Sequence, residues 1–429
     1  MYCGNCFRDN ALVAALRALG HPTLMIPLYL PLTLDEVDQS AGTPTFFSGV
    51  NVYLQQKSAF FRNAPDWLHR FLASPAVLKW AAGRAARTRA ADVGELMLSM
   101  LRGEEGYQAR ELEELIAWLK TQPPPGVICL SNALLVGLAR RLKAGLCAPV
   151  VCMLQGEDSF LDGMTEPHRT RAWQTLAERA RDVDLFIAPS HYFGDLMRGR
   201  LGLPAEKVQV VYNGINLEGY GEIQNSKFKI QNPPTLGFFA RMCPEKGLDL
   251  LVAAYLELRK RSRVPGLQLK IGGGCGPGDE AFVEAQRARL REAGVLDDVM
   301  FHPNLSHADK VKFLESLDVF CTPALYGEAF GLYVIEALAA GVPVVQPRVA
   351  SFPELIAATG GGVIAEPTAR GLADALESLL LEPARARALG EAGRKAVLQD
   401  FSVAGMARDI VQALQTVTAR PAQPPAPHP

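Results

Sequence analysis

The chain has 429 residues, of which 48% are hydrophobic, and a formal net charge of -1 at pH 7. This length argues for two domains or more, and the hydrophobic content is ample for sizeable cores. The balanced charge gives no general electrostatic drive toward nucleic acid or an anionic membrane. No apolar run in the sequence reaches the length of a membrane span.

The first residues contain Cys3 and Cys6 beside Gly4 and Asn5, ahead of a predicted helix over residues 9–19. A structural zinc ion would need two further ligands, and no matching cysteine or histidine pair follows at useful spacing. A redox pair would follow a strand, and none precedes these residues. We therefore interpret them as loop cysteines and predict no metal site.

Strands of the N-terminal half are predicted from short apolar runs, at residues 23–30, 49–54, 127–130 and 150–153. Between the second and third of these strands lies a mainly helical insertion, about 60–120, which is longer than a simple crossover connection. The prolines and glycine at 123–126 end it.

One stretch of the insertion, from Lys79 to Arg89, carries four cations and no acid, with Trp80 among them. A basic helix with a tryptophan can contact a lipid head group or an anionic acceptor. Because the stretch is short and rich in alanine, a solvated helix on the N-terminal domain is the favoured interpretation. Peripheral membrane contact is the alternative.

The loop after the strand at 150–153 contains Gln155, Glu157 and Asp158. Loops at strand ends carry binding residues disproportionately, so these side chains are candidate ligand contacts. Paired acids in a loop are also commonly only solvated.

In the C-terminal half, Arg241 and Lys246 come directly after a predicted strand over residues 236–240. They should therefore lie at the carboxyl end of that strand, where open α/β sheets bind ligands. Arginine offers a planar fork of donors, and lysine offers a mobile point charge. Both would neutralise an anion.

A buried helix is predicted to begin close to Gly331, because residues 323–331 are rich in turn formers and residues 332–340 have helix-forming composition. The amides of Phe330, Gly331 and Leu332 would then point out of the helix N-terminus. Unpaired amides and the positive end of the helix dipole attract anions, and glycine allows a phosphate to approach closely.

Two glutamates flank this helix start, Glu328 just outside it and Glu336 one turn further in. A diphosphate with a sugar on each side fits that arrangement. A surface acid and an ordinary helix-start acid would give the same pattern.

The run from Glu328 to Glu336 resembles the paired-glutamate signature of the retaining glycosyltransferase family four, which has relatives among the glycogen and starch synthases. The strand and loop carrying Arg241 and Lys246 look like the first strand of that family's nucleotide domain. The resemblance covers nearly all of the chain. It implies an α/β fold of the GT-B class, with two Rossmann-like domains facing across a cleft.

The resemblance also implies domain boundaries. An acceptor-side Rossmann-like domain would occupy residues 1–215, a linker 216–234, and a nucleotide-sugar-binding Rossmann-like domain 235–400. A terminal helix at 401–418 would cross back to the first domain. The proline-rich residues 419–429 are predicted to be disordered.

Members of the family open with a β-strand and a glycine-rich loop, whereas this sequence begins inside what resembles that loop, at Gly4 and Asn5. The first strand is therefore expected to be missing, and its loss would leave unpaired strand edges. We hypothesise that Met1 is an internal methionine of a longer natural protein. Gly4 and Asn5 are candidates for the acceptor and sugar side.

The donor side implied by the resemblance consists of Arg241, Lys246, Phe330, Gly331, Leu332 and Glu336. The cations and the helix terminus would stabilise the leaving diphosphate, and Glu336 would hydrogen-bond the nucleotide ribose. Glu328 is implied to be catalytic, by binding the sugar hydroxyls and stabilising positive charge on the ring.

Two positions depart from the family's pattern. Gln155 stands near a position where many members carry a histidine that contacts the transferred sugar, and it cannot carry a proton at neutral pH. With Glu157, it is a candidate for the acceptor side. Ala350 and Ser351 replace paired glycines that relatives often have near the nucleotide.

The resemblance thus implies a metal-independent hexosyltransferase that needs no cofactor. A cytoplasmic location is expected, because the sequence shows neither a membrane span nor the pattern of a signal peptide. It would move a hexose from a nucleoside diphosphate sugar to a hydroxyl of a glycan, lipid or small molecule. Two alternatives remain open. One is a catalytically impaired nucleotide-sugar-binding or scaffold protein, and the other is a sugar phosphorylase or epimerase on the same fold, although no residue specific to either enzyme is identifiable.

Overall fold

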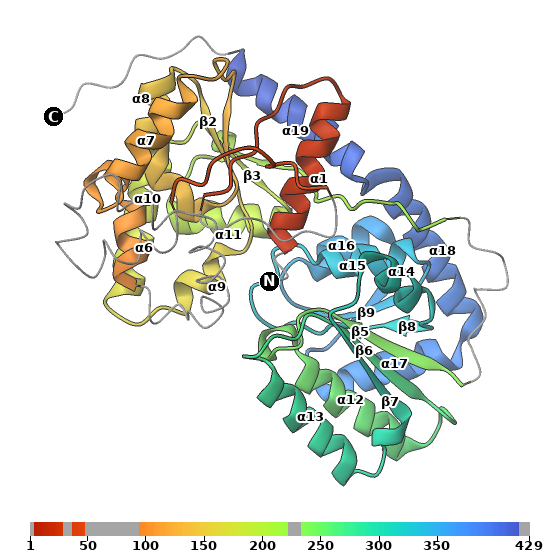
Figure 1. The fold of residues 1–429 in the computed structure, drawn as a ribbon. Helices are drawn as coiled ribbons and strands as arrows, with labels where there is room; N and C mark the ends of the chain where they lie inside the picture. The colour runs from red at the N-terminus through yellow and green to blue at the C-terminus, as the bar shows by residue number, and fades with distance from the viewer. Residues whose placement is uncertain (1–3, 29–36, 48–93, 222–232, 420–429) are drawn as a thin grey trace. The chain divides into compact units, whose positions relative to one another are not determined.

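The computed structural model describes residues 4–28, 37–47, 94–221 and 233–419, which divide into two compact units (Figure 1). The N-terminal unit contains Asn5–Val211 and the chain from Ala407 onward, and the C-terminal unit contains Tyr212–Met406 with Gly4. Each unit is a parallel sheet covered by helices.

The described sheet of the N-terminal unit has four parallel strands in the order β1-β2-β3-β4. Their bounds are Ile128–Leu130, Val150–Met153, Leu185–Ala188 and Val208–Val210. All residues of β2 and β3 are buried. Continuous apolar strands of this kind are typical of parallel sheets covered on both faces.

Seven α-helices are described in the N-terminal unit before its last strand: α1 (Gly4–Ala18), α6 (Gly94–Leu101), α7 (Ala109–Leu119), α8 (Ala139–Leu146), α9 (Glu157–Asp162), α10 (His168–Arg179) and α11 (His191–Leu201). Local sequence explains the ends of α11. The Ser190 side chain caps the amide of Phe193, and Gly202 ends the helix with a φ of 62°.

Two predictions for the N-terminal end are wrong. Helix α1 begins at Gly4, so Gly4, Asn5 and Cys6 are helical and not part of a loop. Glycine and asparagine have low helix propensity, but propensity is a weak guide that context overrides. Residues 23–28 form no strand, and none of them is buried. An apolar pattern makes a strand only where a partner edge pairs with it.

Other predictions lie outside the described residues. They include the strand at 49–54, most of the helical insertion with its basic stretch from Lys79 to Arg89, and Cys3. Much of the linker and nearly all of the proline-rich end lie outside as well.

The C-terminal unit is built on six parallel strands in the order β10-β9-β8-β5-β6-β7. Their bounds in chain order are Thr235–Phe239, Gln268–Gly273, Val299–Pro303, Val319–Phe320, Val344–Pro347 and Gly362–Ala365. From β5 the chain builds outward to β6 and β7, then returns to β8 on the other side. This is the doubly wound Rossmann order, and β5 and β8 flank the point where the order reverses.

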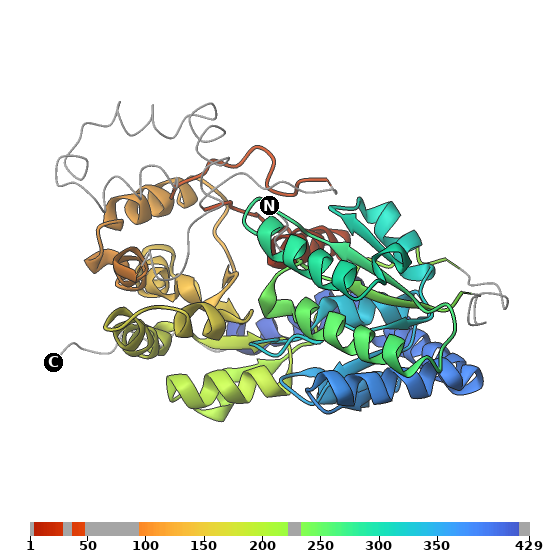
Figure 2. The same cartoon turned by 90° about the horizontal axis from the view of Figure 1, so that it is seen from below.

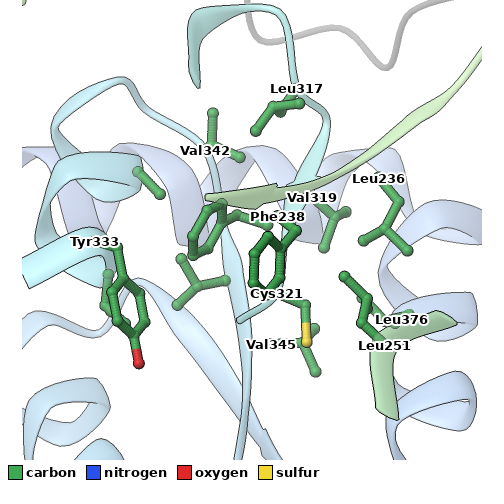
Figure 3. Close-up of a cluster of buried hydrophobic side chains, with 14 of the residues drawn as sticks. Leu236, Phe238, Leu251, Leu317, Val319, Cys321, Tyr333, Val342, Val345 and Leu376 are labelled. Carbon is green, nitrogen blue, oxygen red and sulfur yellow. The ribbon is translucent and has the colours of Figure 1, made fainter. Parts of the chain in front are cut away.

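Helices cover both faces of this sheet (Figure 2). They are α12 (Leu248–Arg261), α13 (Glu280–Glu292), α14 (His307–Glu315), α15 (Leu332–Ala339), α16 (Phe352–Thr359), α17 (Ala369–Leu381) and α18 (Pro383–Asp400). The last helix, α19 (Val403–Thr418), contains the division between the units. In Figure 3, Leu251 of α12 and Leu376 of α17 gather with Leu236 and Cys321 in the apolar core.

Candidate functional site

Two loops of the C-terminal unit meet where its strand order reverses, at the carboxyl ends of β5 and β8. Arg241 follows β5, and Lys246 ends a short 3-10 helix that begins at Pro244. Gly247 comes next with a φ of 72°, and a Cβ atom there would lie 2.1 Å from the carbonyl oxygen of Pro323. Glycine therefore allows the Lys246 loop to pack against the loop that follows β8.

Lys246, Glu328 and Tyr333 converge at this point. The Lys246 Nζ atom lies 2.6 Å from Oε2 of Glu328, and the Tyr333 hydroxyl donates to the same oxygen at 2.7 Å. Burial alone would lower the pKa of Lys246, but the Glu328 carboxylate raises it, so the lysine is charged at neutral pH. Burial, with the neighbouring Glu328, raises the pKa of Tyr333 well above its ordinary value, so the phenol keeps its proton.

Ser351 fixes the backbone of the Glu328 loop. Its hydroxyl lies 2.9 Å from the carbonyl oxygen of Glu328 and 3.0 Å from that of Phe330, and its side chain is buried. Ala350, the preceding residue, has a φ of 51° in the left-handed region. Ala350 and Ser351, which replace glycines of the relatives, therefore differ in effect. Ser351 holds the loop by hydrogen bonds, and Ala350 has a strained backbone.

Helix α15 begins as predicted. Gly331 is its N-cap with a φ of 93°, and it brings no capping side chain. The amide of Leu332, the first of the helix, has no acceptor within the helix, whereas the amide of Val334 donates to the carbonyl oxygen of Gly331 at 2.9 Å. The Phe330 ring is buried and packs near Tyr212 and Phe401, with centroids 6.0 and 6.3 Å away, so only its backbone is available to a ligand.

Asp279, which directly precedes α13, orients Arg241. The Arg241 Nε atom lies 3.1 Å from both carboxylate oxygens of Asp279, and Nη2 lies 2.8 Å from Oδ1. Asp279 is buried, whereas 63% of the Arg241 side chain is exposed. A buried acid thus holds the base of the guanidinium and leaves much of the cation accessible.

Glu336 is paired with Lys310 of α14, with Nζ 2.7 Å from Oε1. Both side chains are more than four-fifths buried. Burial, followed by the charge of Glu336, raises the pKa of Tyr220. The second glutamate of the signature is therefore a largely buried carboxylate that an ion pair holds in place.

In the N-terminal unit, Glu157 links two strand ends. Its Oε1 accepts from the amide of Ala133, after β1, at 2.7 Å, and its Oε2 accepts from the amide of Gln155, after β2, at 2.8 Å. The residue is buried, and burial raises its pKa above the ordinary value. Both carboxylate oxygens are thus engaged by the backbone.

Its neighbours Asp158 and Gln155 differ from Glu157 because each has a buried polar atom without a hydrogen-bond partner among the described residues. The Asp158 side chain is buried, yet its Oδ1 atom has no hydrogen-bond partner in the described part of the chain, and neither has the buried Nε2 atom of Gln155. Burial raises the pKa of Asp158. Buried polar atoms are normally hydrogen-bonded, so these two atoms offer an acceptor and a donor to a bound group.

Gly4 and Asn5 lie at the start of α1. No group of three or more His, Cys, Asp or Glu residues within the described ranges is placed to hold a metal ion. No described helix is both long enough and apolar enough to cross a membrane.

Sequence reasoning missed four partners in the C-terminal unit: Asp279, Lys310, Tyr333 and Ser351. Asp279 and Lys310 are far in sequence from the residues they hold. Tyr333 lies in an apolar helical run and is indistinguishable there from a core aromatic. Only Ser351 carried a signal, as a polar residue where relatives often have glycine.

The fold is that of the GT-B class. The protein is similar to sucrose-phosphate synthase from Thermosynechococcus elongatus, with a TM-score of 0.61 and 22% identity over 72% of this chain and 79% of that one. It is also similar to HepE of Anabaena in complex with UDP-glucose, with a TM-score of 0.61 and 17% identity over 91% of this chain and 100% of that one.

Family models match both halves of the chain. Residues 221–396 match the model described as glycosyl transferases group 1, and residues 91–218 match that of glycosyltransferase family 4. The chain belongs to glycosyltransferase family four.

Curated relatives include the D-inositol 3-phosphate glycosyltransferase of Segniliparus rotundus, 32% identical over 44% of this chain and 42% of the relative. The GDP-mannose-dependent alpha-(1-6)-phosphatidylinositol monomannoside mannosyltransferase of Mycolicibacterium smegmatis is 31% identical over 53% of this chain and 60% of the relative. The glycogen synthase of Mycobacterium tuberculosis is 28% identical over 54% of this chain and 53% of the relative. The matches span about half the length of these relatives.

Proposed function

We propose that the protein is a retaining hexosyltransferase that moves a hexose from a nucleoside diphosphate sugar to a hydroxyl acceptor. The observation that carries this proposal is the Lys246–Glu328 ion pair at the strand reversal, with the accessible Arg241 on the same strand end. A cation for the phosphates and an acid for the sugar stand together there.

On the donor side, Lys246, Arg241 and the first amides of α15 stabilise the negative charge that grows on the leaving diphosphate. Preorganised charges of this kind are usually the largest contribution to catalysis when a bond breaks to an anion. Asp279 supports this role by fixing the Arg241 fork. The charges supplied by the protein support a metal-independent reaction without a cofactor.

Glu328 binds hydroxyls of the donor sugar and stabilises the positive charge that develops on the ring. As the bond from the anomeric carbon to the phosphate oxygen breaks, the acceptor oxygen bonds to that carbon, and the departing phosphate takes the acceptor proton. Glu336, held by Lys310, hydrogen-bonds the nucleotide ribose.

On the acceptor side, Gln155 and Asp158 are better candidates than Glu157. Both carboxylate oxygens of Glu157 already accept hydrogen bonds from backbone amides. In contrast, Oδ1 of Asp158 and Nε2 of Gln155 are buried and have no hydrogen-bond partner in the described part of the chain. Such atoms would recognise a hydroxyl, with Asp158 accepting and Gln155 donating. Gly4 and Asn5 stay predictions at α1.

The names of relatives guide the choice of substrates. They include donors such as GDP-mannose and acceptors such as D-inositol 3-phosphate and phosphatidylinositol mannoside. A glycan or lipid acceptor therefore belongs to the proposal. A cytoplasmic location also belongs to it, since it suits an enzyme that uses nucleotide sugars.

A binding and hydrolysis screen tests the proposal. The full chain is titrated calorimetrically with UDP-glucose, GDP-mannose and ADP-glucose, and release of the nucleoside diphosphate is followed for each. We expect one donor to bind and to be hydrolysed slowly. Binding without turnover, in the presence of inositol and maltose acceptors as well, would favour the scaffold alternative, and no binding would overturn the proposal.

A further inference from the structure

We infer that Tyr333 is a positioning residue for Glu328: with Lys246 it holds one carboxylate oxygen, so that the other oxygen is presented to the donor sugar. This inference rests on the proposed function of Glu328 and deepens it. Tyr333 acts through the acid and does not touch the substrate itself.

The geometry separates the two oxygens of the acid. Both the Lys246 ammonium and the Tyr333 hydroxyl contact Oε2 of Glu328, at 2.6 and 2.7 Å. No donor from the described residues reaches Oε1, and 12% of the Glu328 side chain is exposed. Oε2 of the carboxylate is therefore already hydrogen-bonded, and Oε1 can accept a hydrogen bond from a sugar hydroxyl.

The Tyr333 ring is itself held in place. It is buried on α15, and its centroid lies 6.3 Å from that of Phe320 and 6.4 Å from that of Phe352. In Figure 3 the ring lies at the margin of the apolar cluster, with its oxygen pointing away from Phe238. A hydroxyl on a packed ring is a donor of fixed position, which a phenylalanine would not provide.

Lys246 alone would hold Glu328 less reliably during the reaction. A lysine ammonium is a mobile point charge, and a bound diphosphate attracts it away from the carboxylate. The Tyr333 phenol is neutral, because burial and the neighbouring acid keep it protonated, and its ring is fixed by packing. It therefore keeps Glu328 oriented when the lysine divides its charge between acid and phosphate.

The test compares nucleoside diphosphates with nucleotide sugars in the variant Tyr333→Phe. UDP, GDP and ADP are titrated beside UDP-glucose, GDP-mannose and ADP-glucose, so that each pair isolates the contribution of the sugar. Tyr333→Phe removes a hydrogen bond to a charged group, and we expect the affinity for the nucleotide sugar to fall about tenfold as a result. We expect the Kd of the bare diphosphate to stay within about twofold, and kcat for donor hydrolysis to fall about tenfold.

Tyr255→Phe is the matched control. Its ring is fully buried in the same unit, and its hydroxyl donates to the carbonyl oxygen of Leu267 at 2.9 Å. The same hydroxyl accepts from Nη1 of Arg259 at 2.8 Å. The control therefore loses buried hydrogen bonds that do not involve Glu328, so we expect a lower Tm with the sugar contribution unchanged. A double-mutant cycle completes the set, because Tyr333→Phe should add less than about twofold in a Glu328→Ala background.

Three outcomes overturn the inference. They are an unchanged sugar contribution in Tyr333→Phe, an equal loss for bare diphosphates and nucleotide sugars, and full additivity with Glu328→Ala. Each of these leaves the proposed function standing as long as the wild type binds and hydrolyses a donor. A wild type that binds none of the six ligands overturns the proposed function, and this inference with it.

Discussion

Lys246 and Glu328 form a 2.6 Å ion pair although 82 positions separate them in the chain. The pair joins the loop after β5 to the loop after β8, across the point where the strand order of the C-terminal unit reverses. A cation suited to a phosphate and an acid suited to a sugar are thereby brought together by the topology.

Replacing Lys246 by alanine should weaken the binding of UDP, GDP or ADP, whichever binds best, by about tenfold to a hundredfold, because a charge-assisted contact to the diphosphate is lost. Calorimetric titration measures the change. Lys260→Ala, which removes an exposed cation from the end of α12, is the control and should leave the Kd unchanged. Equal affinities in wild type and Lys246→Ala would remove this lysine from the donor site.

The ion pair also predicts a dependence of stability on pH. Burial lowers the pKa of Lys246, but the Glu328 carboxylate outweighs this effect, so the folded-state pKa lies above the ordinary value of 10.5. The stabilisation is therefore fully present below pH 10.5 and is lost as the pH rises through the folded-state pKa. The Tm difference between wild type and Lys246→Met should be constant from neutral pH upward and shrink only above that value, and a difference that shrinks near pH 8 would contradict the assignment.

Glu336→Ala should weaken the binding of nucleoside diphosphates and of nucleotide sugars by the same factor, about tenfold, because the ribose contact is common to both ligands. Glu328→Ala should instead weaken only the sugar-bearing ligand. Glu292→Ala, an exposed acid on α13, is the control for a change of net charge. If Glu336→Ala reduced only the affinity for the nucleotide sugar, the two glutamates would have to exchange roles.

Several parts of this site were predictable from the sequence. The helix start at Gly331 follows from a change of composition within a few residues, and the strand before Arg241 follows from an apolar run. Asp279 was not predictable, because its contact with Arg241 depends on how β5 and β6 pair and not on any local pattern. The start of α1 at Gly4 was missed because local propensity favours a loop there, and folded context decides such cases.

Adjacent substitutions at Ala350 and Ser351 should change stability in opposite directions. Ala350→Gly relieves a left-handed backbone at φ 51°, a gain of about 0.5–1 kcal/mol after the added flexibility of the unfolded chain is subtracted. Ser351→Ala removes the hydroxyl that contacts the carbonyl oxygens of Glu328 and Phe330, a loss of about 1–2 kcal/mol. Urea unfolding measures both, and changes of the same sign would show that the loop is not held in this way.

Glu157 and Asp158 are neighbours that should respond oppositely to substitution. Glu157→Ala leaves the amides of Ala133 and Gln155 without their acceptor, and it should destabilise the protein by about 2–4 kcal/mol. Asp158→Asn removes a buried charge whose Oδ1 atom has no partner in the described chain. It should stabilise the protein by about 1 kcal/mol at pH 7 while reducing turnover with acceptor, a trade-off expected of a binding group.

The pH dependence identifies the cause of that stabilisation. Burial raises the pKa of Asp158 above its ordinary value of 3.8, so the folded state binds this proton more tightly than the unfolded state does. The contribution of Asp158 to the free energy of unfolding is therefore most favourable below pH 3.8. It becomes less favourable as the pH rises through the folded-state pKa. Asparagine does not titrate, so the Tm advantage of Asp158→Asn should be full at pH 7 and vanish toward pH 3.8. If the Tm advantage persisted at pH 3.8, it would arise from packing and not from removal of a buried charge. That result would contradict the assignment of Asp158 as a charged group that binds an acceptor hydroxyl.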